Sequence, residues 1–214
     1  MKIGITSDCS SGLEYAPFEH HIKITRTTIH FKDEELIDGI DIKAEEFYRR
    51  LKETDIVPST SAPSLGEISK RVEELKAEGC TDVIHFPISF GLSAYGENLL
   101  NAFDNMVEGV KLHVFNCHSA CLMEGYCAHY AEILAERGYT VEEIMDECQK
   151  FADQTVAYLI VDDLKYLVKN GRLNAVSGFI GGLAKIKPIL QLAKNGTIAV
   201  SYTHLRAHET SQDL

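Results

Sequence analysis

The amino-acid sequence predicts an α/β protein: a three-layer unit with a parallel β-sheet covered by helices on both faces, followed by a second, smaller α+β unit. Three observations support this prediction. Short apolar, β-favouring segments alternate with helical segments, which is the pattern of strand–helix–strand units. Most of these strands end in loops rich in Ser, Thr, Asn or Gly, as they do at the ligand edge of such sheets. Beyond residue 154 the alternation stops, and an Asn-Gly turn between two strand-like segments predicts a hairpin.

The first elements follow from composition. Residues 1–6 are β-favouring and predict the first strand, and residues 22–31 are rich in Ile and Thr and predict a second. Residues 34–41 predict a turn or hairpin, and residues 44–52 predict a helix with one apolar face. Residues 57–64 contain two prolines and four hydroxyl residues, so we expect a loop there.

Two capping boxes locate helices in the middle of the chain. Ser64 with Glu67 predicts a helix over residues 64–78, and Thr140 with Glu143 predicts another that ends near residue 152. The other elements of this unit are a buried strand over 82–88, a helix over 98–106, a strand over 112–115 and a long helix over 121–137.

The second unit is expected to begin after residue 153. We expect a strand over residues 157–161, a short helix over 164–169 and a tightly packed helix or turn over the glycine-rich residues 176–184. Strands over 187–193 and 197–202 complete the predicted hairpin. The expected domains are therefore residues 1–153 and residues 154–200.

The composition excludes several classes of protein. Hydrophobic residues make up 45% of the chain and charged residues 25%, which predicts a folded globular protein. The formal net charge of −11 disfavours binding to nucleic acid, because phosphate backbones are repelled. No stretch reaches the roughly 20 apolar residues of a membrane-spanning helix. Six cysteines without an export signal predict reduced thiols and a cytoplasmic protein.

Two patterns leave other functions open. Residues 91–96 resemble the G-x-S-x-G turn of serine hydrolases, with the second glycine one residue late, and this reading makes Ser93 a nucleophile. Cys117, His118 and Cys121 form a C-H-x-x-C group that suits zinc or thiol chemistry. No second pair with suitable spacing accompanies it, so we expect no metal site. The P-loop and dinucleotide-binding patterns do not occur, so no nucleotide cofactor is expected through them.

Hydroxyl groups and one arginine fall in three predicted loops: Thr60 and Ser61 in the first, Ser89 and Ser93 in the second, and Arg172 in the third. Together they suit a carboxylate, because a guanidinium matches two oxygens in its plane and hydroxyls donate to the other lone pairs. The alternative is that the hydroxyl residues are ordinary loop residues and that Arg172 caps the C-terminus of a helix. Spacing alone favours this alternative.

Five motifs then occur in order along the chain. They are an opening strand with a D-S-[ST]-like loop at residues 5–10, a P-x-T-S-[QA]-P-S-like loop at 58–64, an I-S-S-x-L-S-like run at 88–93, a G-G-R-like motif at 170–172 and an I-K-P-I-L-like run at 185–190. This ordered set resembles the DegV family, whose members act as fatty-acid-binding proteins. Cys9 and Phe90 stand where the family often has Ser.

The resemblance implies a two-domain fold that holds a long-chain fatty acid between its domains. It assigns the contacts with the carboxylate to Thr60, Ser93 and Arg172, with Ser61 and Ser89 as weaker neighbours. It implies no catalytic residue and no cofactor other than the bound fatty acid. The expected partner is the catalytic subunit of a bacterial fatty acid kinase, which phosphorylates the carboxylate to an acyl phosphate for phospholipid synthesis. Transient contact with a membrane surface fits this role.

The last residues depart from the family. Members of the family continue beyond this point and complete the second domain, whereas residues 201–214 do not match them and resemble an adapter-derived read-through tail. We therefore expect the second, lipid-binding domain to be truncated after about residue 200.

Overall fold

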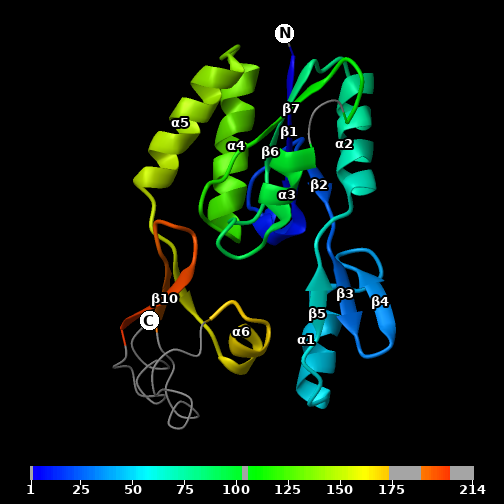
Figure 1. Cartoon of the computed structure of the whole chain (residues 1–214), viewed down its shortest axis with the longest axis vertical. Helices are drawn as coiled ribbons and strands as arrows, with labels where there is room; N and C mark the ends of the chain where they lie inside the picture. The colour runs from blue at the N-terminus through cyan, green and yellow to red at the C-terminus, as the bar shows by residue number, and fades with distance from the viewer. Residues whose placement is uncertain (1, 103–105, 174–188, 203–214) are drawn as a thin grey trace.

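The computed structural model describes residues 2–102, 106–173 and 189–202. At its centre is a four-stranded sheet in the order β2-β1-β6-β7, in which every pairing is parallel (Figure 1). Its strands are β1 (Ile3–Asp8), β2 (Lys23–Thr25), β6 (Asp82–Phe86) and β7 (Lys111–Val114). The predicted parallel sheet is thereby confirmed, with β1 reaching two residues further than expected, to Asp8.

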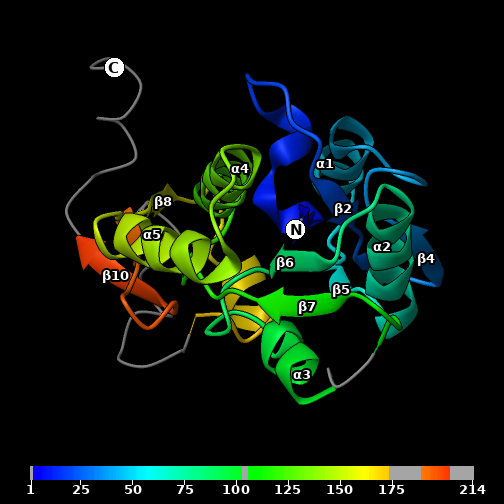
Figure 2. The same cartoon turned by 90° about the horizontal axis from the view of Figure 1, so that it is seen from above.

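Helices cover both faces of this sheet (Figure 2), as predicted. They are α2 (Leu65–Ala77) and α3 (Tyr95–Ala102) on one face and α4 (Leu122–Glu136) and α5 (Val141–Asp153) on the other. Side chains alternate along β6: Ile84 and Phe86 join the core under α4 and α5, whereas Val83 joins the core under α2 and α3. The expected helix over 98–106 begins earlier, at Tyr95, and residues 103–105 lie outside the described residues.

The helix starts follow from their capping residues. The Ser64 side chain accepts a hydrogen bond from the Glu67 amide at the start of α2. At the start of α5, Thr140 and Glu143 form both bonds of the capping box. Each cap pairs amide groups that have no partner inside the helix, so both boundaries were predictable from sequence.

A second, smaller sheet was not predicted. It has the order β4-β3-β5 and is antiparallel, with β3 (Thr28–Phe31), β4 (Glu34–Ile37) and β5 (Ser59–Ser61), and α1 (Ala44–Glu53) lies between β4 and β5 along the chain. The expected single strand over 22–31 is therefore wrong: β2 and β3 belong to different sheets. The loop expected over 57–64 contains β5, which is exposed throughout and so shows no alternation of apolar residues.

The second unit contains a third sheet, antiparallel and in the order β10-β9-β8. The strands of this sheet are β8 (Tyr158–Ile160), β9 (Ile189–Leu192) and β10 (Ile198–Tyr202), and the helix α6 (Lys165–Lys169) follows β8 along the chain. The predicted hairpin is confirmed, and its Gly196 has φ 77°, a conformation that glycine adopts at low cost. The predicted turn over 176–184 and residues 203–214 of the tail lie outside the described residues.

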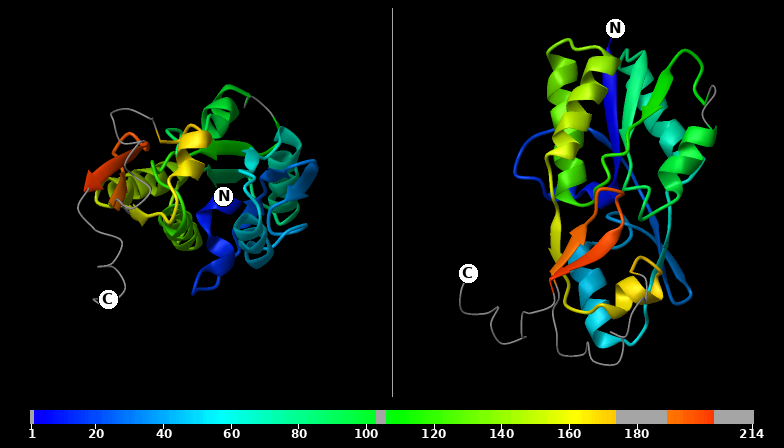
Figure 3. Two further views of the ribbon diagram at one scale, coloured as in Figure 1. Left: turned by 90° about the horizontal axis from the view of Figure 1, so that it is seen from below. Right: turned by 60° about the vertical axis from the view of Figure 1, so that its left-hand side comes forward.

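The two small sheets and α6 lie at the carboxyl edge of the parallel sheet, as Figures 1 and 3 show. This arrangement brings β5, the loop after β6 and the segment after α6 together at that edge. Within the described ranges, no helix is both long enough and apolar enough to cross a membrane.

Candidate functional site

A cavity of about 320 Å³ lies at the carboxyl edge of the parallel sheet. Side chains from all three sheets line it, so segments far apart in the sequence meet there. The lining includes Asp8, Cys9 and Ser10 at the end of β1, Thr60, Ala62 and Pro63 at β5, Ile88, Leu92 and Ser93 between β6 and α3, Tyr95 at the start of α3, Leu167 and Arg172 at α6, and Ile198 of β10, with Thr27 and Asp38. Three of the residues predicted from sequence, Thr60, Ser93 and Arg172, therefore share one cavity.

The two hydroxyls of β5 have different surroundings. Thr60 lines the cavity, whereas the Ser61 Oγ lies 2.6 Å from Nε2 of His30 on the neighbouring strand. Successive side chains of a strand point to opposite faces, so only one of the two can face the cavity. Ser61 is not among its lining residues.

Ser93 lies just before α3 and is bound to its first turn. Its Oγ accepts a hydrogen bond of 3.2 Å from the Tyr95 amide, and its own amide donates to the Ser89 carbonyl at 3.1 Å. The hydroxyl therefore keeps its proton to donate, and the N-terminal end of α3 beside it favours a negative charge.

Arg172 follows the C-terminus of α6 and is exposed. Its guanidinium donates to two backbone carbonyl groups, those of Asn170 and of Leu92, the second at 3.3 Å from Nε. The contact with Leu92 joins the segment after α6 to the loop that carries Ser93. Because a guanidinium has five N–H groups in one plane, these two contacts orient it and leave it able to bind further acceptors.

A buried acidic group forms the floor of the cavity. Asp8 is 1% exposed and accepts hydrogen bonds from the amides of Ser10 (2.8 Å) and Ile88 (2.9 Å). Glu124, in the first turn of α4, is fully buried behind it. Burial raises the pKa of the Asp8 carboxyl, against the effect of the hydrogen bonds from Ser10 and Ile88, and raises that of Glu124 well above its ordinary value.

One aromatic side chain, Tyr95, lines the cavity at the start of α3. Tyr95 is 5% exposed, lines the cavity and packs edge-on against His85 with ring centroids 5.6 Å apart. Its hydroxyl has no hydrogen-bond partner within the described part of the chain. Burial raises the pKa of Tyr95, and Thr25 lies close enough to oppose this shift in part. The Tyr95 hydroxyl is thus a buried donor beside a cavity, which suits a polar ligand.

Ser89 is fully buried but does not line the cavity. Its Oγ donates to the Gly196 carbonyl at 2.9 Å and accepts from the Gly91 amide at 3.2 Å. The backbones of Gly91 and Gly196 also approach each other closely, since a Cβ on Gly91 would lie 2.6 Å from the Gly196 carbonyl carbon. Ser89 therefore fastens the tip of the β9–β10 hairpin to the loop after β6.

We expect Gly196→Ala to weaken this junction. The new Cβ would overlap the Ser89 hydroxyl, and φ at this position is 77°. Gly109→Ala is the matched control, because Gly109 has φ 78° but nothing within 4 Å of an added Cβ. Urea unfolding should show Gly196→Ala to be less stable than the control variant by about 1 to 3 kcal/mol. An equal loss of stability in both variants would contradict close packing between Ser89 and Gly196.

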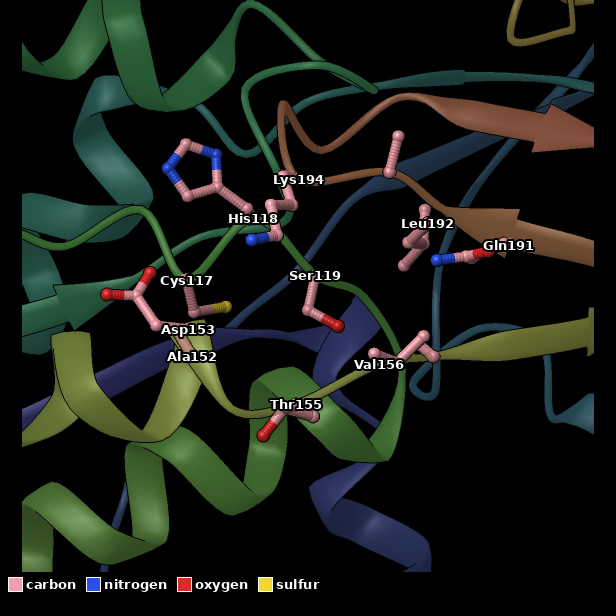
Figure 4. A pocket seen from close by; sticks show the side chains of 12 residues that line it. Cys117, His118, Ser119, Ala152, Asp153, Thr155, Val156, Gln191, Leu192 and Lys194 are labelled. Atoms are coloured by element: carbon pink, nitrogen blue, oxygen red, sulfur yellow. The ribbon is translucent and has the colours of Figure 1, made fainter.

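A smaller cavity of about 110 Å³ lies between the loop after β7, the end of α5 and β9 (Figure 4). Cys117, His118 and Ser119 line it together with Gln191 and Lys194 of the second unit. Cys121, the third member of the C-H-x-x-C group, is exposed and is not part of this lining. Among the described residues, no three His, Cys, Asp or Glu side chains are grouped as metal ligands.

The hydrolase reading requires a base beside Ser93. Within the described residues, the hydrogen bond of the Ser93 hydroxyl is with the Tyr95 amide, and no histidine is bonded to it. His85, which packs against Tyr95, is bonded instead to the Thr6 hydroxyl at 2.8 Å. This geometry supplies no activated nucleophile.

Sequence reasoning missed Asp8, Glu124 and Tyr95. Asp8 carried a usable signal, because it stands in the polar loop at the end of the first strand, where ligand-binding groups collect. Glu124 and Tyr95 carried none, since each lies in a helix and only the folded chain places it beside Asp8.

These features define a class: a three-layer α/β protein with a cavity at the carboxyl edge of its parallel sheet, lined in part by residues of α6 and β10. The model of the DegV family of uncharacterised proteins matches residues 2–211. This chain belongs to the DegV family.

Relatives and solved structures agree with this assignment. A DegV domain-containing protein of Staphylococcus aureus is 35% identical over 193 residues, 89% of this chain and 67% of that protein. The structure of a fatty-acid-binding DegV family protein from Streptococcus agalactiae has a TM-score of 0.85 at 25% identity and covers 97% of this chain and 73% of its own. That of DegV, a fatty-acid-binding protein from Bacillus subtilis, has a TM-score of 0.83 at 30% identity, with the same two coverages.

Proposed function

We propose that this chain binds a long-chain fatty acid, with the carboxylate held by Thr60, Ser93 and Arg172. The observation that carries the proposal is that these three residues, from three separate segments, line one cavity. Related proteins of the same fold bind fatty acids, as the structures from Streptococcus agalactiae and Bacillus subtilis are described. Ser61 and Ser89 are left out of the ligand contacts, because they do not line the cavity.

The cavity suits both ends of such a ligand. Leu92, Leu167 and Ile198 give it apolar walls, and each CH₂ removed from water contributes about 0.8 kcal/mol. A carboxylate taken out of water must be hydrogen-bonded or paired, or its burial is unfavourable. Two hydroxyls and a guanidinium meet that requirement.

The chain acts, in this proposal, as the acyl-carrying subunit of a cytoplasmic fatty acid kinase. The kinase partner supplies ATP, since the sequence contains no P-loop pattern, and phosphorylates the carboxylate that this chain presents. The chain itself performs no chemistry. Adding the catalytic subunit of a fatty acid kinase and ATP to the loaded protein should yield an acyl phosphate, which hydroxylamine traps as a hydroxamate.

Native mass spectrometry tests the binding step directly. Protein purified from bacteria should carry the added mass of one fatty acid, and protein stripped of lipid should rebind palmitate or oleate one to one. A protein that purifies without fatty acid and takes up neither ligand after stripping would contradict the proposal.

A further inference from the structure

Asp8 and Glu124 form a buried acidic pair that the proposed function does not use. Asp8 lines the cavity, and Glu124 lies behind it. Ser10 connects them: its Oγ is 2.8 Å from Oε2 of Glu124 and is also hydrogen-bonded to Oδ1 of Asp8. In the described part of the chain no Lys or Arg is paired with either carboxyl group. A charge on both members would therefore be unfavourable.

The hydrogen bonds around the pair require a proton beyond those of the serines. The Ser7 Oγ is 2.7 Å from the Phe86 carbonyl oxygen and 3.0 Å from Oε1 of Glu124, so it has two acceptor partners, and Ser10 has two as well. Each hydroxyl has one proton to donate, so four oxygen–oxygen contacts share two hydroxyl protons. A proton on Glu124 supplies a third, because Glu124 can then donate to Ser10 while Ser10 donates to Asp8.

We assign the remaining charge of the pair to Asp8, although burial raises the pKa of its carboxyl group. Asp8 accepts from two backbone amides, which favours its carboxylate form, whereas the charge of Asp8 further raises the pKa of Glu124. The cavity also contains Asp38 and Arg172. Two acidic residues, Asp8 and Asp38, and one basic residue, Arg172, are among the described residues that line the cavity, so an incoming carboxylate meets no excess of basic groups there.

On the basis of the proposed function, we propose that Asp8, positioned by Glu124 through Ser10, shares a proton with the head group of the bound fatty acid. The pocket then takes up a carboxylate together with one proton from solvent, and the two carboxyl groups hold that proton between them. Two carboxylates in contact do not both stay ionised, which is the physical reason for the uptake. The Tyr95 hydroxyl, which lines the same cavity and has no hydrogen-bond partner among the described residues, supplies a further donor.

Other titratable groups face the pair and must be distinguished from it. Burial raises the pKa of Cys9 to about 12, raises that of Tyr95, and lowers that of His85 to about 3, so these three stay neutral near neutral pH. Cys117 also faces the pair, and a hydrogen bond with Cys127 lowers its pKa. Cys117 therefore needs its own control.

Calorimetry measures the uptake. Lipid-free protein is titrated with palmitate at about pH 7.5 in two buffers of different ionisation enthalpy, and with palmitamide, a neutral ligand with the same chain. We expect close to one proton taken up per palmitate and none per palmitamide. Palmitate affinity should fall by up to about tenfold per pH unit as the pH rises, as uptake of one proton requires. Palmitate binding without proton uptake would overturn the inference while leaving the proposed function intact, whereas failure to bind palmitate would overturn the proposed function.

Variants assign the proton to Asp8. Asp8→Asn should abolish the uptake with palmitate, and binding of palmitamide by this variant, at whatever affinity, shows that the pocket is still folded. Glu132→Gln and Cys117→Ser are the controls. Glu132 is a buried carboxylate in α4, the helix that also contains Glu124, but its partners are the His21 amide and the His129 ring. Both variants should retain the uptake. Proton uptake that persists in Asp8→Asn would refute the role of Asp8. If this variant does not fold, the inference is tested by the difference in proton uptake between palmitate and palmitamide in the natural sequence.

Discussion

Acidification is expected to destabilise the fold by up to about 1.4 kcal/mol per pH unit through one side chain, His85. His85 is fully buried in β6, and burial lowers its pKa from 6.5 to about 3. Its Nδ1 is bonded to Thr6, and its Nε2 has no partner among the described residues. The unfolded chain binds a proton at a higher pH than the folded one, so stability present above pH 6.5 is lost progressively as the pH falls towards 3.

Urea unfolding of His85→Gln isolates this contribution. Asp8 and Glu124 act in the opposite direction, because their raised folded-state pKa values make them stabilising as the pH falls. The pH dependence of stability must therefore be compared between the natural sequence and His85→Gln, since Asp8 and Glu124 are present in both. From about pH 7.5 to about pH 5.5, the natural sequence should lose about 1.4 kcal/mol more than His85→Gln. Exposed His21 provides the control His21→Gln, and an unchanged pH dependence in His85→Gln would show that His85 is protonated without unfolding.

Arg172→Ala is expected to weaken palmitate binding by roughly tenfold to a hundredfold. A charge-assisted hydrogen bond contributes about 1.5 to 3 kcal/mol, and the guanidinium is the basic group among the described residues that line the cavity. The affinity of Arg172→Lys for palmitate should lie between those of the natural sequence and of Arg172→Ala, because lysine keeps the charge but lacks the planar pair of donors. Displacement of a fluorescent fatty acid from lipid-free protein measures each affinity.

The control for this prediction is Arg137→Ala, because Arg137 is exposed at the C-terminus of α4 and does not line the cavity. Its affinity for palmitate should equal that of the natural sequence. Equal binding by Arg172→Ala would instead remove the guanidinium from the contacts with the head group.

Sequence predicted the elements whose causes are local. The caps at Ser64 and Thr140 act within one helical turn, and the apolar run of β6 is a property of five consecutive residues. The break between β2 and β3 has a distant cause. Arg26 lies there, and its guanidinium binds both Glu14 oxygens at 2.9 and 2.7 Å and the Asp38 carbonyl, contacts that no window of sequence contains.

The same distinction applies to the cavity. Resemblance to a family placed Thr60, Ser93 and Arg172 in one site, and the structure brings all three to one cavity. Residue type alone could not separate Ser61 from Thr60, because that depends on which face of β5 each residue occupies. Ser89 was assigned to the ligand by its type, whereas its hydroxyl is used by Gly196, 107 residues away in the chain.

This separation in sequence also sets an order of events during synthesis. Chain elongation at about 5 to 20 residues per second leaves roughly 5 to 20 seconds between the emergence of Ser89 and that of Gly196. During that interval the nascent parallel sheet can form its helix-covered layers, but its ligand edge lacks Arg172 and Ile198, both of which line the cavity. The cavity is thus completed late in translation, after the strands of the parallel sheet have been synthesised.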